Sequence, residues 1–360
     1  MRLIRHLPWI GILACSFSAC VQAAAPLPDS ERAVLLELYD LTGGPSWINR
    51  NFWGGPPGSE CDLENPWSGV ECRLGADGFN HVADIFLESN GLNGTLPADF
   101  NKLTQLELLE LSFNNSFGQV LSGPFPSLDG MTKLISLRAE GDQFTGPIPS
   151  LSTLTSLQAF NIGGNHLTGH IPSLDGLPEL SFAAFDANNL DGPIPSLANV
   201  PKIFVFSASS NHLTGSIPAL GVVHSFSVHS NQLDGSIPTL GDNTHLVSFD
   251  VHSNRFTGSI PALAGVTNLQ IFDASNNLLT GSIPPLDATQ IHQFMVGGNK
   301  LTGLVPAASP VPIVGRSNLC PNSLDLTPSA NDEGWNTATN LHPWWGAFHS
   351  RCDILFRDGF

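Results

Sequence analysis

Apolar and polar residues follow a pattern that returns ten times between residues 81 and 305. Each unit has an anchor Asn, or Asp142 in the third unit, with apolar residues eight, five and three positions before it. The last two apolar residues alternate with polar ones, as Leu109 and Leu111 do, which is the period of a strand with one buried face. The anchors are Asn90, Asn114, Asp142, Asn165, Asn188, Asn211, Asn231, Asn254, Asn277 and Asn299. The pattern predicts ten short strands spaced 20–28 residues apart.

The residues after each anchor keep a second pattern, Leu-x-Gly-x-Ile-Pro, as in "HLTGSIP" at 212–218. Glycine permits a turn there, and proline ends regular strand pairing. A unit of this kind buries its apolar face only against its neighbours, so stability requires a stack with capped ends. Units of this length and spacing are leucine-rich repeats.

The Gly-x-Ile-Pro ending resembles the plant-type leucine-rich repeats of receptor-kinase ectodomains and polygalacturonase-inhibiting proteins. The resemblance covers about residues 29–352, including the opening "DSERAVLLELYDLTGG" and the closing "SNLCPNSL". It implies an α/β solenoid, which is a right-handed superhelix with a parallel β-sheet on its concave face. It also implies a ladder of hydrogen bonds made by the anchor side chains. Asp142 has no NH2 donors, so we expect a looser third coil.

The segments outside the repeats predict an exported chain with two caps. Arg2 and Arg5, an apolar stretch and small residues match a secretory signal. The predicted segments are a signal peptide at 1–23, an N-terminal cap at 24–80, ten leucine-rich repeats at 81–305 and a C-terminal cap at 306–360. An alternative makes Cys15 or Cys20 a lipid-attachment site that tethers the chain. No later stretch has the roughly 18–20 apolar residues that span a bilayer, so we expect a secreted, extracellular or periplasmic protein.

Each cap carries two cysteines, which in an exported protein favours disulfides. We predict local pairing within each cap, between the members of the pairs Cys61–Cys72 and Cys320–Cys352. Zinc is a weak alternative because neither pair has Cys-x-x-Cys spacing. The first cap should contain a helix with Asp29 as its N-cap residue. Three tryptophans are expected to cover the last coil: Trp335, Trp344 and Trp345.

Composition narrows the function. The formal net charge is −17 over 360 residues, which disfavours nucleic acid and anionic membranes as partners. Only 12% of residues are charged, while 35 Gly and 28 Pro indicate many turns. We find no nucleophile motif, no phosphate-binding glycine loop and no metal-binding signature. We therefore expect a protein that is not an enzyme and has no cofactor, catalytic residue or bound metal.

The exposed strand positions should be those four and two places before each anchor. They predict a charged N-terminal third, a smooth centre of Ser, Gly and Ala, and a patch of His and Asp in repeats seven to nine. The candidate partner-binding residues on this concave face are Glu88, Glu110, Arg138, Glu140, Asp186, His229, Asp250, His252 and Asp273. Three phenylalanines are further candidates for exposed apolar anchors, although core packing is as good an interpretation: Phe86, Phe182 and Phe204.

The patch allows several interpretations. His229 and His252 occupy equivalent positions on adjacent strands, so they should lie about 5 Å apart, with Asp250 and Asp273 beside them. Two imidazoles and two carboxylates can bind a transition metal or act as an acid–base pair. They can also contact a partner, or be solvated polar residues that repeat duplication has copied. We favour the last interpretation over a partner-binding patch, and both over metal binding or catalysis.

The resemblance to polygalacturonase inhibitors favours a recognition module that binds a protein through its concave face. Such a module is an inhibitor of a secreted enzyme or a factor in interaction with a host. The alternative is a structural protein whose regular array binds polysaccharide, a cell surface or ice. The Ser, Gly and Thr positions permit this, but no uninterrupted Thr ladder runs along an exposed strand.

Overall fold

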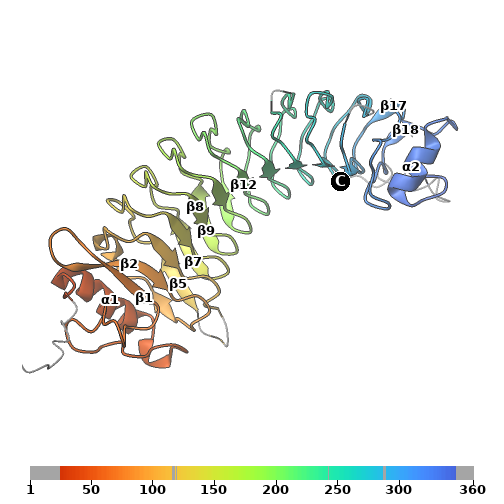
Figure 1. Cartoon of the computed structure of the whole chain (residues 1–360). Helices are drawn as coiled ribbons and strands as arrows, with labels where there is room; N and C mark the ends of the chain where they lie inside the picture. The colour runs from red at the N-terminus through yellow and green to blue at the C-terminus, as the bar shows by residue number, and fades with distance from the viewer. Residues whose placement is uncertain (1–24, 116–117, 119, 242, 287–288, 346–360) are drawn as a thin grey trace, which may run out of the picture.

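Parallel strands from successive repeats form one continuous sheet along the inner side of an arc (Figure 1). In this computed structural model the described residues are 25–345, except 116–117, 119, 242 and 287–288. Among them the sheet has eleven strands, and all but the first pair run parallel. The prediction of a solenoid of about ten repeats is confirmed. The predicted signal peptide, Cys15, Cys20 and Cys352 lie outside the described residues.

The order of this sheet follows the chain. Its strands are β1 (Val70–Leu74), β2 (Asn80–Phe86), β4 (Leu108–Glu110), β6 (Ser136–Arg138), β8 (Ala159–Asn161), β10 (Phe182–Ala184), β12 (Val205–Ser207), β13 (Ser225–Ser227), β14 (Ser248–Asp250), β15 (Ile271–Asp273) and β16 (Gln293–Met295). Residues four places before successive anchors are register partners, for example Asp250 and Asp273. The spacing of the anchors therefore predicted the register correctly.

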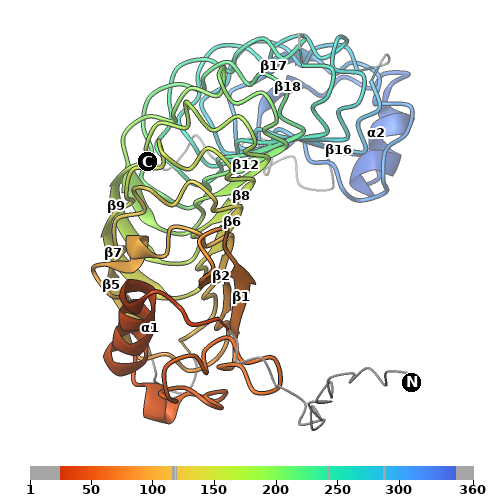
Figure 2. The same cartoon turned by 60° about the vertical axis from the view of Figure 1, so that its left-hand side comes forward.

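A second sheet follows the turns after the first five anchors, on another side of the coil (Figure 2). Its strands are β3 (Gly94–Thr95), β5 (Leu121–Pro124), β7 (Gln143–Pro147), β9 (His166–His170) and β11 (Asn189–Asp191). A separate parallel pair, β17 (Thr302–Leu304) and β18 (Ser323–Asp325), lies near the C-terminal cap. The remaining connections carry one short 3-10 helix among the described residues of the repeats, Phe100–Lys102.

The core between the two sides is a stack of apolar layers. In the later repeats the residue five places before each anchor is a fully buried Phe. The rings form a column in which the centroids of Phe226 and Phe249 lie 5.8 Å apart, and those of Phe249 and Phe272 lie 5.7 Å apart. Each ring contacts only its two neighbours in the column, which is how a repeat stack divides its stability among its interfaces.

The anchor side chains form the expected ladder. The amide nitrogen of Asn254 donates to the carbonyl oxygens of Val228 (3.0 Å) and Val251 (3.2 Å), and its oxygen accepts the N–H of Leu233 (3.0 Å). Each Asn thus satisfies backbone groups in its own coil and in the preceding one, where water cannot reach them. The ladder continues to Asn322, whose amide donates to Val296 and accepts from Leu301 in the same way.

Asp142 interrupts this ladder. One carboxylate oxygen accepts the N–H of Asn114 at 2.6 Å, but the other is buried with no hydrogen-bond partner. Asp142 is only 3% exposed. Burial raises the pKa of Asp142 to about 7, and the bond from Asn114 opposes this rise only in part. The ladder is therefore broken at this coil, and the looser third coil expected from the sequence stays a prediction.

Aromatic residues close both ends of the stack. Helix α1 (Asp29–Leu41) lies in the first cap, and the prediction that Asp29 is its N-cap residue is wrong. Asp29 is the first helical residue, and the capping position is taken by Pro28, which has no side-chain acceptor. At the other end, helix α2 (Asp332–Thr339) buries Trp335, which is 1% exposed, and Trp344 is 2% exposed. Trp335 packs against Phe294 of the last coil, with ring centroids 6.0 Å apart, and Trp344 joins the same core, whereas Trp345, the third predicted residue, is only partly buried against it.

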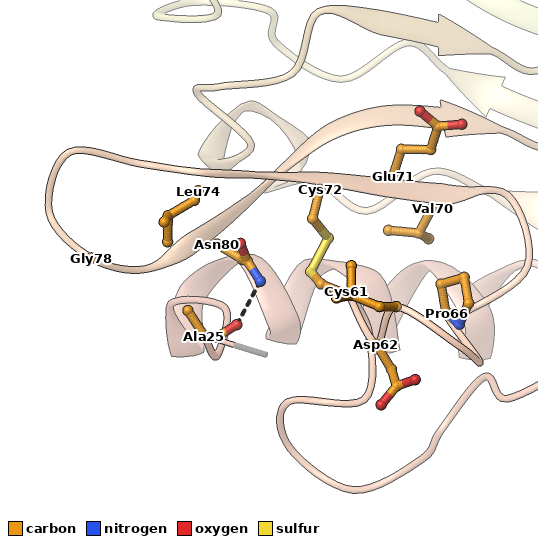
Figure 3. Close-up of a pocket in the computed structure, with 11 residues that line it drawn as sticks. Ala25, Cys61, Asp62, Pro66, Val70, Glu71, Cys72, Leu74, Gly78 and Asn80 are labelled. Atoms are coloured by element: carbon orange, nitrogen blue, oxygen red, sulfur yellow. Dashed lines mark hydrogen bonds between the residues drawn. A yellow bond between two sulfur atoms is a disulfide. The ribbon is translucent and has the colours of Figure 1, made fainter. Parts of the chain in front are cut away.

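The predicted disulfide in the first cap is confirmed. Cys61 and Cys72 are bonded, with their Cα atoms 5.6 Å apart, beside a pocket of about 720 Å³ (Figure 3). Asn80 donates to the carbonyl of Ala25 at the rim of this pocket. Cys320 also takes part in a disulfide, and its predicted partner, Cys352, lies outside the described residues.

Candidate functional site

The concave surface presents the two columns of residues that the sequence predicted. The column four places before the anchors is confirmed by the strand register throughout, from Phe86 and Glu110 to Asp273 and Met295. Most of the predicted site residues on it are exposed or half-buried. Asp273 is the exception, because it is 7% exposed. Its predicted exposure is wrong, since its carboxylate bends back to its own backbone.

The charged N-terminal third forms a cross-strand cluster. Arg138 Nε lies 3.5 Å from Glu110 Oε1, and the amide of Asn161 donates to Glu140. Partial burial raises the pKa of Glu110; Arg138 opposes this rise, whereas the charges of Glu88 and Glu140 add to it. Glu88 is exposed. Acidic groups therefore outnumber basic ones on this part of the surface.

Next to this cluster the concave face has a shallow hollow of about 440 Å³. The hollow is present because Gly163 and Ala184 occupy inner positions where other repeats have longer side chains. Its lining residues are Phe113, Glu140, Gly141, Asn161, Gly163, Gly164, Phe182, Ala184 and Asp186. It is thus bordered by two aromatic rings and two carboxylates.

Phe113 was not predicted from the sequence. It stands one place before an anchor, where most other repeats have Ser, Ala, Asn or Gly, and it has a positive φ of 61°. Its ring is half exposed and lies across the next repeat at Gly141, where an added Cβ would come within 2.6 Å of it. A bulky residue at a position that otherwise holds small ones was the signal that could have identified it.

Asp186 is held in a fixed orientation at the other side of the hollow. Its Oδ1 accepts the hydroxyl of Ser207 at 2.5 Å and the N–H of Ser209 at 2.7 Å. Ser209 in turn hydrogen-bonds Ser227 at 2.8 Å. The smooth centre predicted from its Ser residues is therefore a network that orients one carboxylate, rather than a row of free hydroxyls.

The patch in repeats seven to nine has the predicted neighbours, but its four groups do not meet at one point. The rings of His229 and His252 are stacked, with centroids 4.3 Å apart and planes 13° from parallel. Nδ1 of His252 lies 2.7 Å from Oδ1 of Asp250 and 3.6 Å from Oδ2 of Asp273. Nδ1 of His229 instead lies 3.1 Å from the hydroxyl of Ser230.

The carboxylate of Asp273 is anchored by its own turn. Its Oδ1 accepts the N–H of Ser275 at 2.9 Å and the hydroxyl of Ser275 at 2.7 Å. Burial raises the pKa of Asp273, the bonds from Ser275 oppose the rise, and the charge of Asp250 adds to it. The carboxylate is therefore oriented but desolvated.

The three candidate phenylalanines differ in environment. Phe86 and Phe204 are exposed, and Phe204 stacks on His224 with ring centroids 4.1 Å apart. Phe182 is half-buried and borders the hollow. All three therefore have apolar surface that a partner can reach.

A row of hydroxyl residues on the outer part of the turns was also missed, because the sequence analysis considered only the inner strands. The exposed position three places after the anchor carries Thr in most repeats from the third onward: Thr145, Thr168, Thr214, Thr257, Thr280 and Thr302. Asp191 and Asp234 interrupt the row. Backbone bonds such as Thr280 N–H to Gly258 O (2.7 Å) keep its members on adjacent chain segments.

Comparisons with known proteins agree with this geometry. The profile of the Leucine Rich Repeat family matches residues 268–287. Receptor-like kinase TMK2 of Arabidopsis thaliana is 30% identical over 134 residues, which are 37% of this chain and 13% of the kinase. The chain therefore spans only a small part of the curated relatives that it matches.

Two solved structures are similar over most of the chain. The ectodomain of the receptor kinase GASSHO1/SCHENGEN3 from Arabidopsis thaliana, in complex with CASPARIAN STRIP INTEGRITY FACTOR 2, has a TM-score of 0.68 and 29% identity. The alignment covers 82% of this chain and 36% of that one. A plant ice-binding protein has a TM-score of 0.67 and 24% identity, covering 84% of this chain and 97% of that one, a likeness of fold alone.

The fold and its anchor ladder define a protein built of leucine-rich repeats. One of its repeats matches the Leucine Rich Repeat family, and the fold is similar to the ectodomains of plant receptor kinases. No helix among the described residues is both long and apolar enough to cross a membrane.

Proposed function

We propose that this protein is a secreted, non-enzymatic recognition module that binds a basic peptide segment of a partner protein on its concave face. The observation that carries the proposal is the hollow between repeats two and five. Phe113 and Phe182 supply apolar surface there, and Glu140 and Asp186 supply negative charge. Aromatic rings beside carboxylates suit a Lys or Arg side chain, whose stem is apolar and whose end is positively charged.

Two further features support the proposal. The formal net charge of −17 favours basic partners, because complementary charge speeds encounter and disfavours acidic competitors. The similar ectodomain of GASSHO1/SCHENGEN3 is in complex with CASPARIAN STRIP INTEGRITY FACTOR 2, so a solenoid of this kind can hold a second molecule. We assign an extracellular location to the module on the same grounds. Its partner would be an enzyme that it inhibits or a host surface protein.

The proposal predicts which peptides the protein selects. A random peptide library displayed on phage and selected on the immobilised protein should yield sequences enriched in Lys and Arg. For a synthetic peptide from this selection, the double variant Glu140→Gln/Asp186→Asn should bind at least about tenfold more weakly by calorimetry, as expected for loss of charged hydrogen bonds. Its affinity should also depend less on salt, because exposed charge pairs are screened.

The double variant Asp175→Asn/Glu179→Gln is the matched control. It removes the same two charges from the exposed connection before β10, outside the hollow. It should leave the affinity within about twofold. If both double variants weaken peptide binding equally, the loss comes from the overall net charge and the concave site is contradicted. Selected peptides without Lys or Arg would also contradict it.

The row of Thr residues favours a second candidate function, binding to a regular surface such as ice. Backbone hydrogen bonds join the later threonines to the preceding turns, as from Thr257 to Gly235 and from Thr280 to Gly258, so equivalent residues repeat at roughly the 4.8 Å spacing of paired strands. The row therefore presents regularly spaced hydroxyl and methyl groups. Thr257, Thr280 and Thr302 form its longest uninterrupted run. Three exposed serines lie beside this run, in the turns of repeats seven to nine: Ser236, Ser259 and Ser282. The fold that this chain shares with a plant ice-binding protein is compatible with this function.

The second candidate predicts that the native protein slows ice recrystallisation. The variant Thr257→Tyr/Thr280→Tyr should lose this effect severalfold, because two bulky rings break the even surface. The variant Glu140→Gln/Asp186→Asn should keep it. If ice crystals grow as fast with the native protein as in buffer alone, this candidate function is contradicted. The proposal of peptide recognition would be unaffected by that result.

A further inference from the structure

Side chains from β14, from the residues just after it and from β15 converge on the concave face at a point that peptide recognition does not use. We propose that Asp250, His252 and Asp273 bind one divalent transition-metal ion, with Zn²⁺ as the representative ion. One oxygen or nitrogen atom from each side chain lies within 4.8 Å of the other two. The proposal is independent of the hollow between repeats two and five.

The spacing of these atoms is close to that of a coordination shell. Zn²⁺ holds oxygen and nitrogen ligands at about 2.0–2.2 Å, so neighbouring ligands in a tetrahedral shell lie roughly 3.4 Å apart. Nδ1 of His252 lies 2.7 Å from Asp250 and 3.6 Å from Asp273. Shifts of well under 1 Å therefore bring both carboxylate oxygens to ligand spacing around this nitrogen. Small rotations of the partly exposed side chains of Asp250 and His252 supply such shifts.

Asp273 presents a largely desolvated carboxylate to the other two side chains. Asp273 is 7% exposed, and both of its hydrogen bonds, from Ser275, go to Oδ1. Among the described residues Oδ2 accepts no hydrogen bond, and Nδ1 of His252 lies 3.6 Å from it. A desolvated carboxylate oxygen beside a second carboxylate is unfavourable unless positive charge lies next to it. A bound dication supplies that charge.

The ligand set selects the class of ion. Ca²⁺ takes six to eight oxygen ligands and Mg²⁺ keeps several waters, so neither ion favours an imidazole. An imidazole with two carboxylates suits Zn²⁺ and its first-row neighbours. Ser275 fixes the orientation of Asp273, as the supporting hydrogen bonds of metal ligands usually do.

His229 is outside this set. Its ring is stacked nearly parallel on that of His252, so the lone pairs of the two rings lie in separate planes that do not meet at one ion. Three protein ligands leave at least one coordination position open on the concave side. The stacked ring of His229 forms one wall beside the ion.

Calorimetric titration of the full chain with Zn²⁺ alone tests the proposal. The native protein should bind one equivalent of Zn²⁺. His252→Gln and Asp273→Asn should each lower the affinity for Zn²⁺ at least tenfold. Asn at position 273 keeps the acceptor for Ser275, and Gln at 252 replaces a half-exposed ring, so both variants should fold. Thermal melts followed by circular dichroism verify this. If Asp273→Asn does not fold, His252→Gln alone decides.

Two controls come from the chain itself. His229→Gln changes the equivalent residue of the preceding repeat, and His170→Gln changes an exposed His that has a single carboxylate partner, Asp191, at 2.5 Å. Both variants should still bind one equivalent of Zn²⁺. Unchanged Zn²⁺ binding in His252→Gln would overturn the proposal, and so would loss in His229→Gln. Displacement of Zn²⁺ by equimolar Ca²⁺ would overturn the choice of a transition metal.

Discussion

The substitution Asp142→Asn should stabilise the protein by about 2–4 kcal/mol at pH 8. The pKa of Asp142 rises from 3.8 to about 7 on folding, and each unit of difference corresponds to about 1.4 kcal/mol, which sets the upper end of this range. Asn also restores the two donors of the ladder, so it can reach the carbonyl oxygens that its counterparts reach in other coils. Urea denaturation followed by circular dichroism measures the difference.

The same substitution should remove a pH dependence. A carboxyl whose pKa is higher in the folded state binds its proton more tightly there, so its stabilising effect is complete below about pH 4. It is lost as the pH rises to about 7, because the folded protein must then hold a buried charge. The native protein should therefore lose stability between pH 4 and 8 relative to Asp142→Asn. The difference in stability between Asp142→Asn and the native protein should narrow to about 1 kcal/mol at pH 4, which is the net contribution of a hydrogen bond.

Asp234→Asn is the matched control for this prediction. Asp234 is exposed in a turn, and its substitution removes one negative charge without touching the ladder. It should change stability by less than about 0.5 kcal/mol at either pH. A gain in Asp142→Asn that is the same at pH 4 and pH 8 would mean that the carboxyl of Asp142 titrates normally in the folded protein.

The strand register could be predicted because the repeat period fixes it. Once each Asn was taken as an anchor, residues four places before it had to pair along the sheet, and the pairing of Asp250 with Asp273 followed. The ladder defect at Asp142 was also predictable, because only the chemistry of the side chain is needed. These features depend on local spacing that every coil shares.

Features that break the repeat were not predictable in the same way. Asn322 was missed as a ladder residue because Ser317 and Leu326 stand where the pattern expects an apolar residue and a Gly. The hollow depends on how the ring of Phe113 crosses a neighbouring glycine, which no spacing rule contains. The burial of Asp273 depends on its bonds to Ser275. Such contacts join residues whose side-chain directions the repeat does not fix.

The column of phenylalanines leads to the largest loss of stability that we expect. Phe249 is fully buried and contacts a ring on each side, so it couples the coils of repeats seven, eight and nine. Phe249→Ala should destabilise the protein by about 3–5 kcal/mol, since it removes a large buried side chain and leaves a cavity between two rings. Phe249→Leu should cost less, because Leu fills part of the same volume.

The position of the defect should also change the shape of the unfolding transition. Because each coil contacts only its neighbours, a weak interface in repeat eight divides the stack, and the two parts then unfold separately. The described tryptophans lie in the two caps, so their fluorescence reports the ends, while circular dichroism reports the whole solenoid. In urea the two signals should coincide for the native protein and separate for Phe249→Ala. Phe204→Ala, at a residue 52% exposed, should cost less than about 1 kcal/mol and keep the signals together. Coincident signals and a small loss in Phe249→Ala would show that the coils are held by the ladder rather than by the aromatic column.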